Sequence, residues 1–594
     1  MNRNRTFPVA ALIVIVLAAL RPVSTLATDA PPANQSGSRA ETAARVNAAA
    51  DAYLAAYFQH FPEWATFYRI EGARHDRFRD NTAAGRAAWQ AVEDVLIAKL
   101  ASIRVADLDG PAAVTYEVLR EQLESSRQAR VCRSENWSVD QVWGWQIALG
   151  ELAEAQPVGT AEERARALAR WQQMPGFIDA ETRNLAEGLR AGYSAPKRNV
   201  DLVVEQLDGL LAMAPEASPF YAPARAAGDE VLAAQWAKLL KDEVYPAIAR
   251  HRDYLRTEYR NGARTAIAVT SNPDGEACYQ ALLRFNTTLP YRPKEMFEAG
   301  EQAVALRESS SAEIGKRVFG TSDLAEIRKR LRSESSNRFS TRDELLAYTT
   351  AAIERARTSA PQWFNQLPKA VVVIKPVPEY QEQSSTARYM PASDDRKVPG
   401  TYFVNLYQPE KQSKGATESV AFHETYPGHH LQIALAQEQI SSHSLLRYLG
   451  NSGFTEGWAR YSETLAAEMG LYSSELNILE MLSAPPTGMV VDPGIHAMGW
   501  TREQAIEYTL SKQVGMTPEE AGAYVDRIVV WPGQMVTYGA GELEIVRLRG
   551  EAERTLGKEF DIRAFHDRVI GRGAVTLTML RAQVSEWIKE QSAK

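Results

Sequence analysis

Apolar residues recur every three or four positions along most of this chain, the spacing that puts them on one face of a helix. The pattern predicts helices over Arg45–Phe58, Ala84–Ile103, Ala161–Ala191, Asn199–Met213 and Ala233–Tyr259. Residues typical of helix N-termini mark further starts at Thr160, Ser340 and Thr517. The chain is therefore expected to be mainly α.

Two short runs of β-branched and aromatic residues interrupt this pattern, Ala370–Ile374 and Thr401–Leu406. Both precede the histidine-rich part of the chain, so we expect a small β-sheet beside it. An exposed edge strand of such a sheet can hold an extended peptide through main-chain hydrogen bonds. The alternative is a hairpin that packs under a helix and contacts no substrate.

Composition restricts the function only in part. The 594 residues are 45% hydrophobic and 24% charged, which is ordinary for a globular protein. A net charge of −7 and a pI near 5.9 argue against a nucleic-acid partner. The sequence also lacks the phosphate-binding G-x-x-x-x-G-K-[ST] and the nucleophile motif G-x-S-x-G.

The N-terminus has the three parts of a secretory signal peptide. Arg3 and Arg5 precede an apolar run from Val9 to Leu20, and Thr25-Leu26-Ala27 places small residues before a cleavage point. Twelve apolar residues are too few for a membrane span, which needs roughly 20. We therefore expect residues 1–27 to be removed, no stable membrane anchor to remain, and the protein to be periplasmic or secreted.

The remaining chain is expected to have a flexible lead-in over residues 28–44 and one helical domain over 45–594. We divide that domain into an N-terminal half, about 45–365, and a half with the candidate metal site, about 366–594. The only cysteines are Cys132 and Cys278, both far from a cleavage point, which argues against a lipoprotein anchor. In an exported protein the simplest expectation is that they form one disulfide.

The strongest chemical signal is a segment with three of the nine histidines, His423-Glu424-Thr425-Tyr426-Pro427-Gly428-His429-His430. Zinc hydrolases commonly carry H-E-x-x-H, in which two imidazoles four residues apart bind the metal and the glutamate is the general base. Here the fourth position is Pro427. In a regular helix the sixth residue lies ~120° round the axis and the seventh about 10 Å along it, so neither can share a zinc with His423.

Pro427-Gly428 offers a departure from the regular helix. Proline removes a backbone donor, and glycine tolerates unusual dihedral angles. A bulge at this point would absorb the two extra residues and bring His429 to the usual ligand position. Either His429 or His430 could be the second ligand, and spacing alone leaves this open.

A third ligand is offered by a helical segment that begins near Gly453. Glu456 lies 33 residues after His423, and Glu463 lies on the same helix face two turns later. Two histidines and a glutamate from a second helix form a recurrent catalytic zinc site. We therefore expect one Zn²⁺ held by His423, His429 and Glu456, with Glu463 orienting a ligand.

Hydrolysis at such a site needs a base and an oxyanion donor. Glu424 is expected to take the proton of the attacking water. Tyr538, between glycines where a loop becomes a helix, is the better oxyanion candidate. His496 is a candidate for a second donor or for a contact with a substrate carboxylate.

Together these motifs resemble a bacterial family known as domain of unknown function 885. The resemblance runs from about residue 45 to the C-terminus and rests on the segments around His423, Glu456, His496 and Tyr538. That family is in turn similar to the gluzincin peptidases, such as angiotensin-converting enzyme and thermostable carboxypeptidases. The similarity implies two helical halves around a deep cleft. One position departs from the gluzincin pattern, since Arg460 stands where an acidic residue is usual.

The sequence thus predicts an exported zinc-dependent hydrolase of peptide or related amide bonds, with a short peptide or a terminal residue as substrate. One alternative is an amidohydrolase that acts on a non-peptide amide or a conjugated amino acid. The other is a binding protein with a vestigial metal site.

Overall fold

The computed structural model describes residues 38–379, 382, 386–393, 398–439 and 443–593. The expected signal peptide, 1–27, lies outside the described residues. Among the described residues, no helix combines the length and apolarity that crossing a bilayer requires.

The fold is mainly α, as predicted. Helices before the sheet are α1 (Arg39–His60), α2 (Pro62–Phe67), α3 (Ala83–Ala101), α4 (Gly110–Ala129), α5 (Trp145–Ala155), α6 (Ala161–Trp171), α7 (Met174–Arg190), α8 (Lys197–Ala212), α9 (Ala222–Ala227), α10 (Glu230–Leu239), α11 (Tyr245–Tyr254), α12 (Arg260–Gly262), α13 (Gly275–Thr287), α14 (Pro293–Phe319), α15 (Leu324–Ser333) and α16 (Arg342–Ser359). Those after it are α17 (Lys414–Glu424), α18 (His429–Glu438), α19 (Leu445–Tyr448), α20 (Ser452–Glu468), α21 (Glu475–Leu482), α22 (Gly488–His496), α23 (Arg502–Lys512), α24 (Pro518–Val530), α25 (Val536–Leu556), α26 (Ile562–Ile570) and α27 (Leu577–Ser592).

Local sequence explains where several helices begin. Ser38 and Glu41 form a reciprocal capping box, so α1 starts at Arg39, inside the stretch expected to be a flexible lead-in. Thr160 and Thr517 cap α6 and α24 as predicted. The long helix expected over Ala161–Ala191 is instead two, because Pro175 opens α7 and cannot continue a preceding helix.

The small sheet has three strands in the order β1-β3-β2. β1 (Val372–Pro376) and β3 (Gly400–Val404) correspond to the two predicted runs and pair in parallel. β2 (Arg388–Met390) pairs antiparallel to β3, with Tyr389 opposite Tyr402. Only three residues long, β2 has too little alternation to be recognised from sequence. It forms one edge of the sheet.

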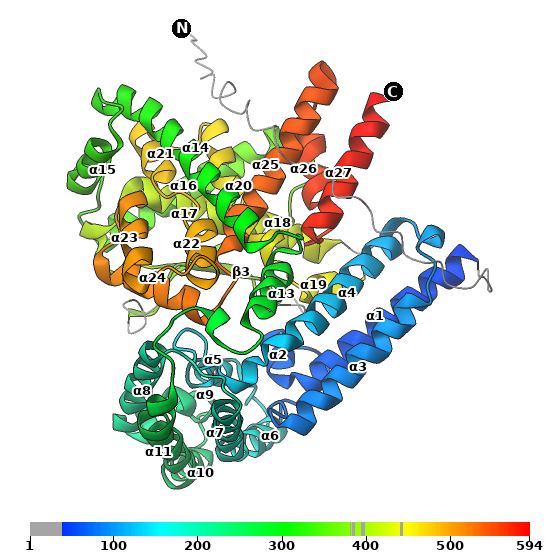
Figure 1. The fold of residues 1–594 in the computed structure, drawn as a ribbon, viewed down its shortest axis with the longest axis vertical. Coiled ribbons are helices and arrows are strands. Elements are labelled where there is room, and N and C mark those ends of the chain that lie inside the picture. Colours follow the sequence, from blue (N-terminus) through cyan, green and yellow to red (C-terminus); the bar gives the residue numbers. More distant parts are fainter. Residues whose placement is uncertain (1–37, 380–381, 383–385, 394–397, 440–442, 594) are drawn as a thin grey trace.

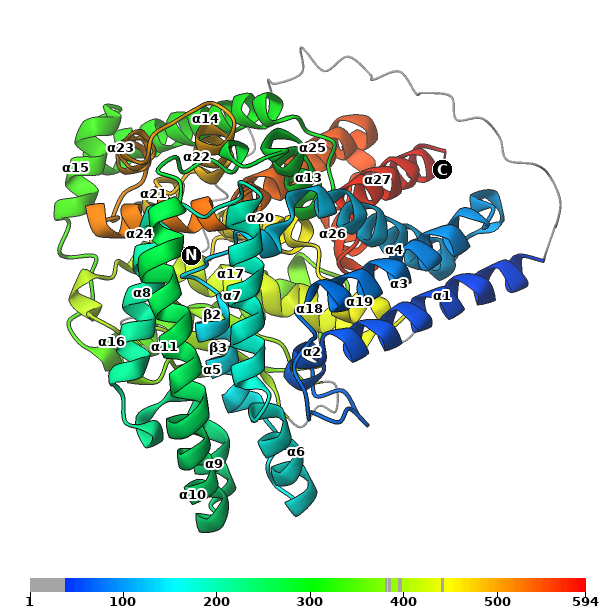
Figure 2. The same ribbon diagram turned by 60° about the horizontal axis from the view of Figure 1, so that its bottom comes forward.

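The helices gather around two main hydrophobic cores. The helices α1, α3 and α4 lie side by side along one flank, and α5 to α11 form a separate group at the bottom of the view in Figure 1. Figure 2 shows α17, α18 and α20 near the middle of the molecule. The larger core runs from Val46 in α1 to Ile588 in α27, whereas the second lies wholly within residues 78–263.

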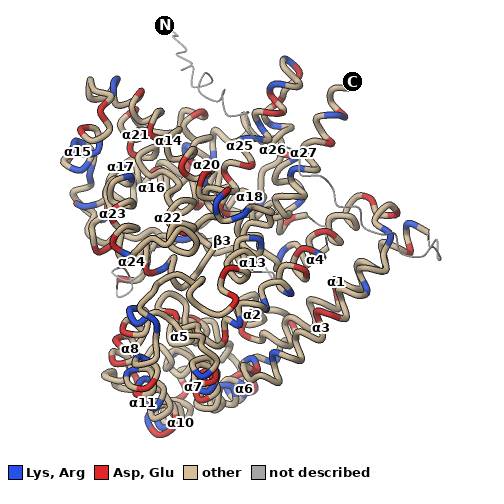
Figure 3. Tube along the Cα trace, viewed as in Figure 1, with Lys and Arg blue, Asp and Glu red and all other residues tan. Residues whose placement is uncertain are grey.

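The cores therefore do not divide at residue 365, where the sequence placed a boundary between two halves. The first helices belong to the same core as the last, because α1 packs on α3 and α4, and both α1 and α4 contact α19 in the second half of the chain. Figure 3 shows that Lys, Arg, Asp and Glu are interspersed along the peripheral helices. Such mixing fits the modest net charge of −7.

Cys132 and Cys278 form the expected disulfide, with their Cα atoms 4.6 Å apart. Both are buried in a small core with Trp137 and Tyr279. The bond joins the end of α4 to α13 across 146 residues of sequence.

Breaking this disulfide should destabilise the protein substantially. Closing so long a loop restricts the unfolded chain, so changing both cysteines to serine should lower the free energy of unfolding by about 2–5 kcal/mol. Denaturant titration of the double variant and of the wild-type protein measures the difference. Equal midpoints in the two would show that the bond contributes nothing to stability.

Candidate metal centre

The histidine-rich segment is broken into two helices rather than bulged within one. α17 ends at Glu424, and α18 begins at His429. In the connection, the N–H of Gly428 donates to the carbonyl of Phe422 at 3.0 Å, and that of Leu431 to Thr425 at 3.3 Å. The expected bulge is thus corrected to a helix break, since neither Thr425 nor Gly428 has helical dihedral angles.

Close packing explains the residues in the break. A Cβ on Gly428 would lie 1.9 Å from the carbonyl oxygen of His423, so only glycine fits there. The carbonyl of Pro427 accepts hydrogen bonds from the Trp458 indole at 2.9 Å and the Ser462 hydroxyl at 3.2 Å. Both donors lie on α20, which therefore holds the break in place.

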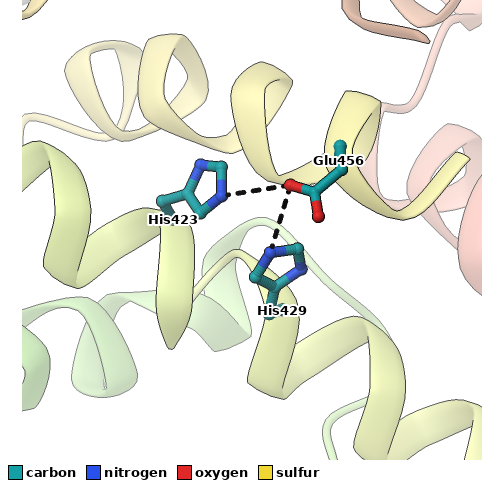
Figure 4. A group of neighbouring side chains, drawn as sticks. All are labelled: His423, His429 and Glu456. Atoms are coloured by element: carbon teal, nitrogen blue, oxygen red, sulfur yellow. Dashed lines mark ion pairs between the residues drawn. The ribbon is translucent and has the colours of Figure 1, made fainter. Parts of the chain in front are cut away.

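His423, His429 and Glu456 converge from three helices, as Figure 4 shows. One carboxylate oxygen of Glu456 lies 3.6 Å from Nε2 of each histidine. Two corners of a tetrahedron with arms of ~2.1 Å, the usual Zn–N length, are about 3.4 Å apart. The three predicted ligand residues are therefore brought together at distances that suit one ion.

The adjacent His430 faces elsewhere. It is fully buried, its Nδ1 pairs with the Tyr389 hydroxyl at 3.0 Å, and its Nε2 donates to the carbonyl of Ala370 at 3.2 Å. Burial lowers the pKa of His430 to about 4, so it is neutral. Among the described residues it is therefore His429, and not His430, that lies with His423 and Glu456, a point that spacing alone left open.

Glu463 contacts His423 directly, at 2.9 Å from its Nδ1. The second carboxylate oxygen of Glu463 accepts from Ser419 at 2.9 Å and from Arg460 at 2.8 Å. Arg460 therefore holds the carboxylate of Glu463 in place. Burial opposes ionisation, but the charge of Arg460 and the bond from His423 lower the pKa of Glu463 to about 2.

The charges of the three residues are coupled. Burial acts against protonation of His423, but hydrogen bonds with Glu456 and Glu463 outweigh it and raise its pKa to about 10. Burial likewise opposes ionisation of Glu456, but His429 and His423 hold its pKa well below the usual range. Two imidazoles and one carboxylate are a donor set that zinc prefers, so the residues present fit this metal.

Glu424 lies beside this group at the end of α17. One of its carboxylate oxygens, Oε2, accepts the backbone N–H of Tyr389 in β2 at 2.9 Å. Burial raises the pKa of Glu424, while the nearby imidazoles of His423 and His429 act in the opposite direction. Among the described residues nothing bonds to its other oxygen, which leaves that atom available to a water molecule.

Tyr538 approaches the centre from the first turn of α25. Burial raises the pKa of its hydroxyl, and the charge of Glu456 raises it further. The helices that carry the two residues cross closely, since a Cβ on Gly541 would lie 1.9 Å from the carbonyl oxygen of Gly453. Tyr538 is therefore on the part of α25 that packs against the helix of Glu456.

His496 does not have the role expected from sequence. It is fully buried at the end of α22, where its Nδ1 accepts the N–H of Val269 at 3.0 Å and its Nε2 donates to the carbonyl of Ile528 at 3.0 Å. Burial lowers its pKa to about 3. With both ring nitrogens bonded to backbone, His496 joins three segments of the fold and has no donor left for a substrate.

Sequence inspection missed several residues that shape the centre, namely Ser419, Trp458 and Tyr389. The first two are ordinary helix residues whose contacts depend on which helices pack together. Tyr389 had one weak signal, an aromatic residue shortly before Pro391, but its strand is too short to predict.

Removing the carboxylate that orients His423 should weaken metal binding. Glu463→Gln keeps the shape but loses the charge, so zinc affinity should fall about 10–100-fold. Competition with a chelating dye measures the change in zinc affinity. The control is Glu586→Gln on α27, which removes the same charge far from the centre and should leave the zinc affinity unaltered. An unaltered affinity in Glu463→Gln would mean that this contact does not tune the ligand.

Comparison with known proteins identifies the family. Residues 62–584 match the family described as "Bacterial protein of unknown function (DUF885)". The chain belongs to the DUF885 family. No curated protein matches this DUF885 chain.

Two solved structures share its fold. A "putative lipoprotein" from Colwellia psychrerythraea is 24% identical in sequence, and the two structures superpose with a TM-score of 0.84. The matched region covers 93% of this chain and 100% of the lipoprotein chain. A "putative lipoprotein of unknown function" from Shewanella oneidensis is 20% identical, covers 92% and 99%, and has a TM-score of 0.74. A "putative oligoendopeptidase F" from Bacillus anthracis str. Ames is 14% identical, covers 85% and 95%, and has a TM-score of 0.33, too low to indicate a common fold.

Proposed function

We propose that this DUF885 protein is a zinc-dependent hydrolase of peptide or related amide bonds. The observation that supports this most is the meeting of His423, His429 and Glu456, with Glu424 beside them. The described residues thus supply both a ligand set and a base, the two parts that metal-assisted hydrolysis requires.

In the proposed reaction, Glu424 and Glu463 have separate roles. A bound zinc supplies Lewis acidity and brings the pKa of water close to neutral. The free oxygen of Glu424 takes a proton from the attacking water, while its other oxygen stays fixed by the N–H of Tyr389. Glu463 keeps His423 oriented through Nδ1, so that Nε2 faces Glu456, where it would be able to bind zinc.

Tyr538 is the proposed oxyanion donor. Its pKa is raised, so the hydroxyl keeps its proton near neutral pH. It can then donate that hydrogen to the carbonyl oxygen of the substrate as negative charge develops there. Its place beside Glu456 suits this role.

The sheet offers a binding edge for an extended substrate. The outward N–H of Tyr389 reaches Glu424, so the free edge of β2 faces the centre. In an antiparallel strand the N–H and C=O of one residue point to the same side, and the N–H of Tyr389 is already taken by Glu424. The carbonyl of Tyr389 is thus the group on this edge that is left to accept a hydrogen bond from an extended substrate.

We also propose that the protein acts outside the cytoplasm. This rests on the signal-like segment at residues 1–27 and on the Cys132–Cys278 disulfide, a bond that persists in oxidising compartments.

Metal analysis and a substrate panel together test the proposed function. Protein purified without chelator should contain about one zinc per chain, and it should cleave short peptides or other amides. Dialysis against a chelator should abolish cleavage, and added zinc should restore it. Absence of stoichiometric zinc would refute the proposal, whereas cleavage of non-peptide amides alone would narrow it to an amidohydrolase.

A further inference from the structure

A half-buried arginine beside the centre has no acidic partner. The Nη2 atom of Arg527, on α24, donates to Gln534 at 3.0 Å, and its guanidinium lies over the ring of Trp531, 5.2 Å from the centroid. Its Nε is buried and makes no hydrogen bond within the described part of the chain. The adjacent Asp526 is already paired with Arg502, so it does not neutralise Arg527.

This arginine is close to the proposed oxyanion donor. Gln534, which accepts from Arg527, lies four residues before Tyr538. The helix that carries Tyr538, α25, crosses α20 beside Glu456, since a Cβ on Gly457 would lie 2.4 Å from the Cα of Gly541. Tyr524 lies about one turn before Arg527 on α24 and carries another hydroxyl. Donors therefore collect on one side of the metal ligands.

A guanidinium withdrawn from water without a counter-ion is costly unless an anion reaches it. In the described structure, no carboxylate lies within ion-pair distance of Arg527. Its fork of donors matches a carboxylate in two places at once. The missing partner is thus best supplied by a ligand.

We propose that Arg527 binds the C-terminal carboxylate of the substrate, which makes this protein a hydrolase of residues at the carboxyl end of short peptides. The inference rests on the proposed function, because it places the scissile carbonyl at the centre formed by His423, His429 and Glu456. Arg527 becomes the residue that determines specificity, and it takes the carboxylate-binding role that was first expected of His496.

The arrangement limits how far the carboxylate lies from the scissile bond. Arg527 reaches Gln534 just before α25, and Glu456 lies where α20 crosses the same helix near Gly541, so no more than about two helical turns, roughly 10 Å, separate the two sites. Each residue of an extended peptide spans roughly 3.5 Å. A carboxylate one or two residues beyond the scissile bond fits this separation, and the middle of a long chain would leave Arg527 without a partner.

Binding measurements test the proposal without relying on turnover. The zinc-loaded Glu424→Gln protein would be titrated calorimetrically with a panel of N-acetyl dipeptides that end in alanine, each as the free acid and as the amide. The acids should bind about 10–100-fold more tightly than their amides, as expected for a charge-assisted contact. Arg527→Gln should remove this preference, and Arg527→Lys should restore part of it.

A matched control comes from the same region of the fold. Arg554→Gln on α25 also removes one positive charge, but at an exposed position 16 residues after Tyr538, which is about 24 Å along the helix. It should leave the preference for acids unchanged. A loss as large as that in Arg527→Gln would mean that overall charge, and not Arg527, attracts the acids.

Other outcomes overturn the proposal. Equal binding of acids and amides, or no binding of any acid at millimolar concentration, would show that no terminal carboxylate is recognised. If Arg527→Gln weakened the binding of acids and of amides by the same factor, Arg527 would have a structural role only. Tight binding of N-acetyl dipeptide amides that end in aspartate, without binding of the acids, would transfer the site to a side-chain carboxylate. Since none of these measures hydrolysis, failure of the proposed function would be recognised separately.

Discussion

Changing Glu424 to glutamine should abolish hydrolysis while leaving the metal in place. Glutamine has nearly the same shape, and its side-chain oxygen can still accept the N–H of Tyr389. It cannot take a proton from water, so kcat should fall about 100- to 10,000-fold. Zinc content, measured by mass spectrometry of the purified variant, should remain close to one ion per chain.

The control for this variant is Glu410→Gln, which removes an exposed carboxylate upstream of α17. It should turn over substrate at the wild-type rate. If Glu424→Gln also remained active with zinc bound, another group would have to be the base. If it lost zinc, the activity loss would say nothing about proton transfer, and Glu424 would have to be treated as part of the metal site.

Two neighbouring histidines should respond in opposite ways to substitution. His429→Gln removes a ligand, so zinc affinity should fall by more than the roughly 100-fold that accompanies loss of an orienting contact, and activity should go with it. His430→Gln should keep stoichiometric zinc. Its cost should be in stability, about 1–3 kcal/mol, because the hydroxyl of Tyr389 and the carbonyl of Ala370 lose a buried partner.

Metal content and denaturant unfolding of both variants distinguish these effects. Loss of zinc from His430→Gln, with retention in His429→Gln, would reverse the assignment of the second ligand. If both variants lost zinc equally, the structure of the first turn of α18 would depend on both imidazole rings. The wild-type protein and the Glu410→Gln variant fix the range of normal values.

Helical spacing and capping residues were sufficient to predict the class of the fold. They failed where backbone chemistry overrides periodicity, as at Pro175, which divides one expected helix into α6 and α7. The site was partly predictable because ligand types are chemically restricted, so His423, His429 and Glu456 stood out from spacing and residue type. How the chain would reach that arrangement was not predictable, since the break after Glu424 depends on α20 holding Pro427.

His496 shows the limit of residue type as a guide to function. Its sequence context, a histidine near glycines and proline, is common to catalytic loops and to buried helix ends. Only the partners of its ring nitrogens decide between them, and these come from Val269 and Ile528, far away in sequence. Arg527 was missed for the opposite reason, because the important fact is a partner that it lacks.

The shared core of the first and last helices has a consequence for how the chain folds. The helix around Val46 is made first and packs directly on α3 and α4, but the core that it belongs to extends through α19 to Ile588, near the end of the chain. The core within residues 78–263 does not depend on later parts of the chain and can form as soon as this segment has been made. The lower helical group should therefore fold early, whereas α1 and α4 cannot complete their contacts with α19 until most of the chain has been made. A chain that stops short of α19 would lack part of the surface against which its first helices pack.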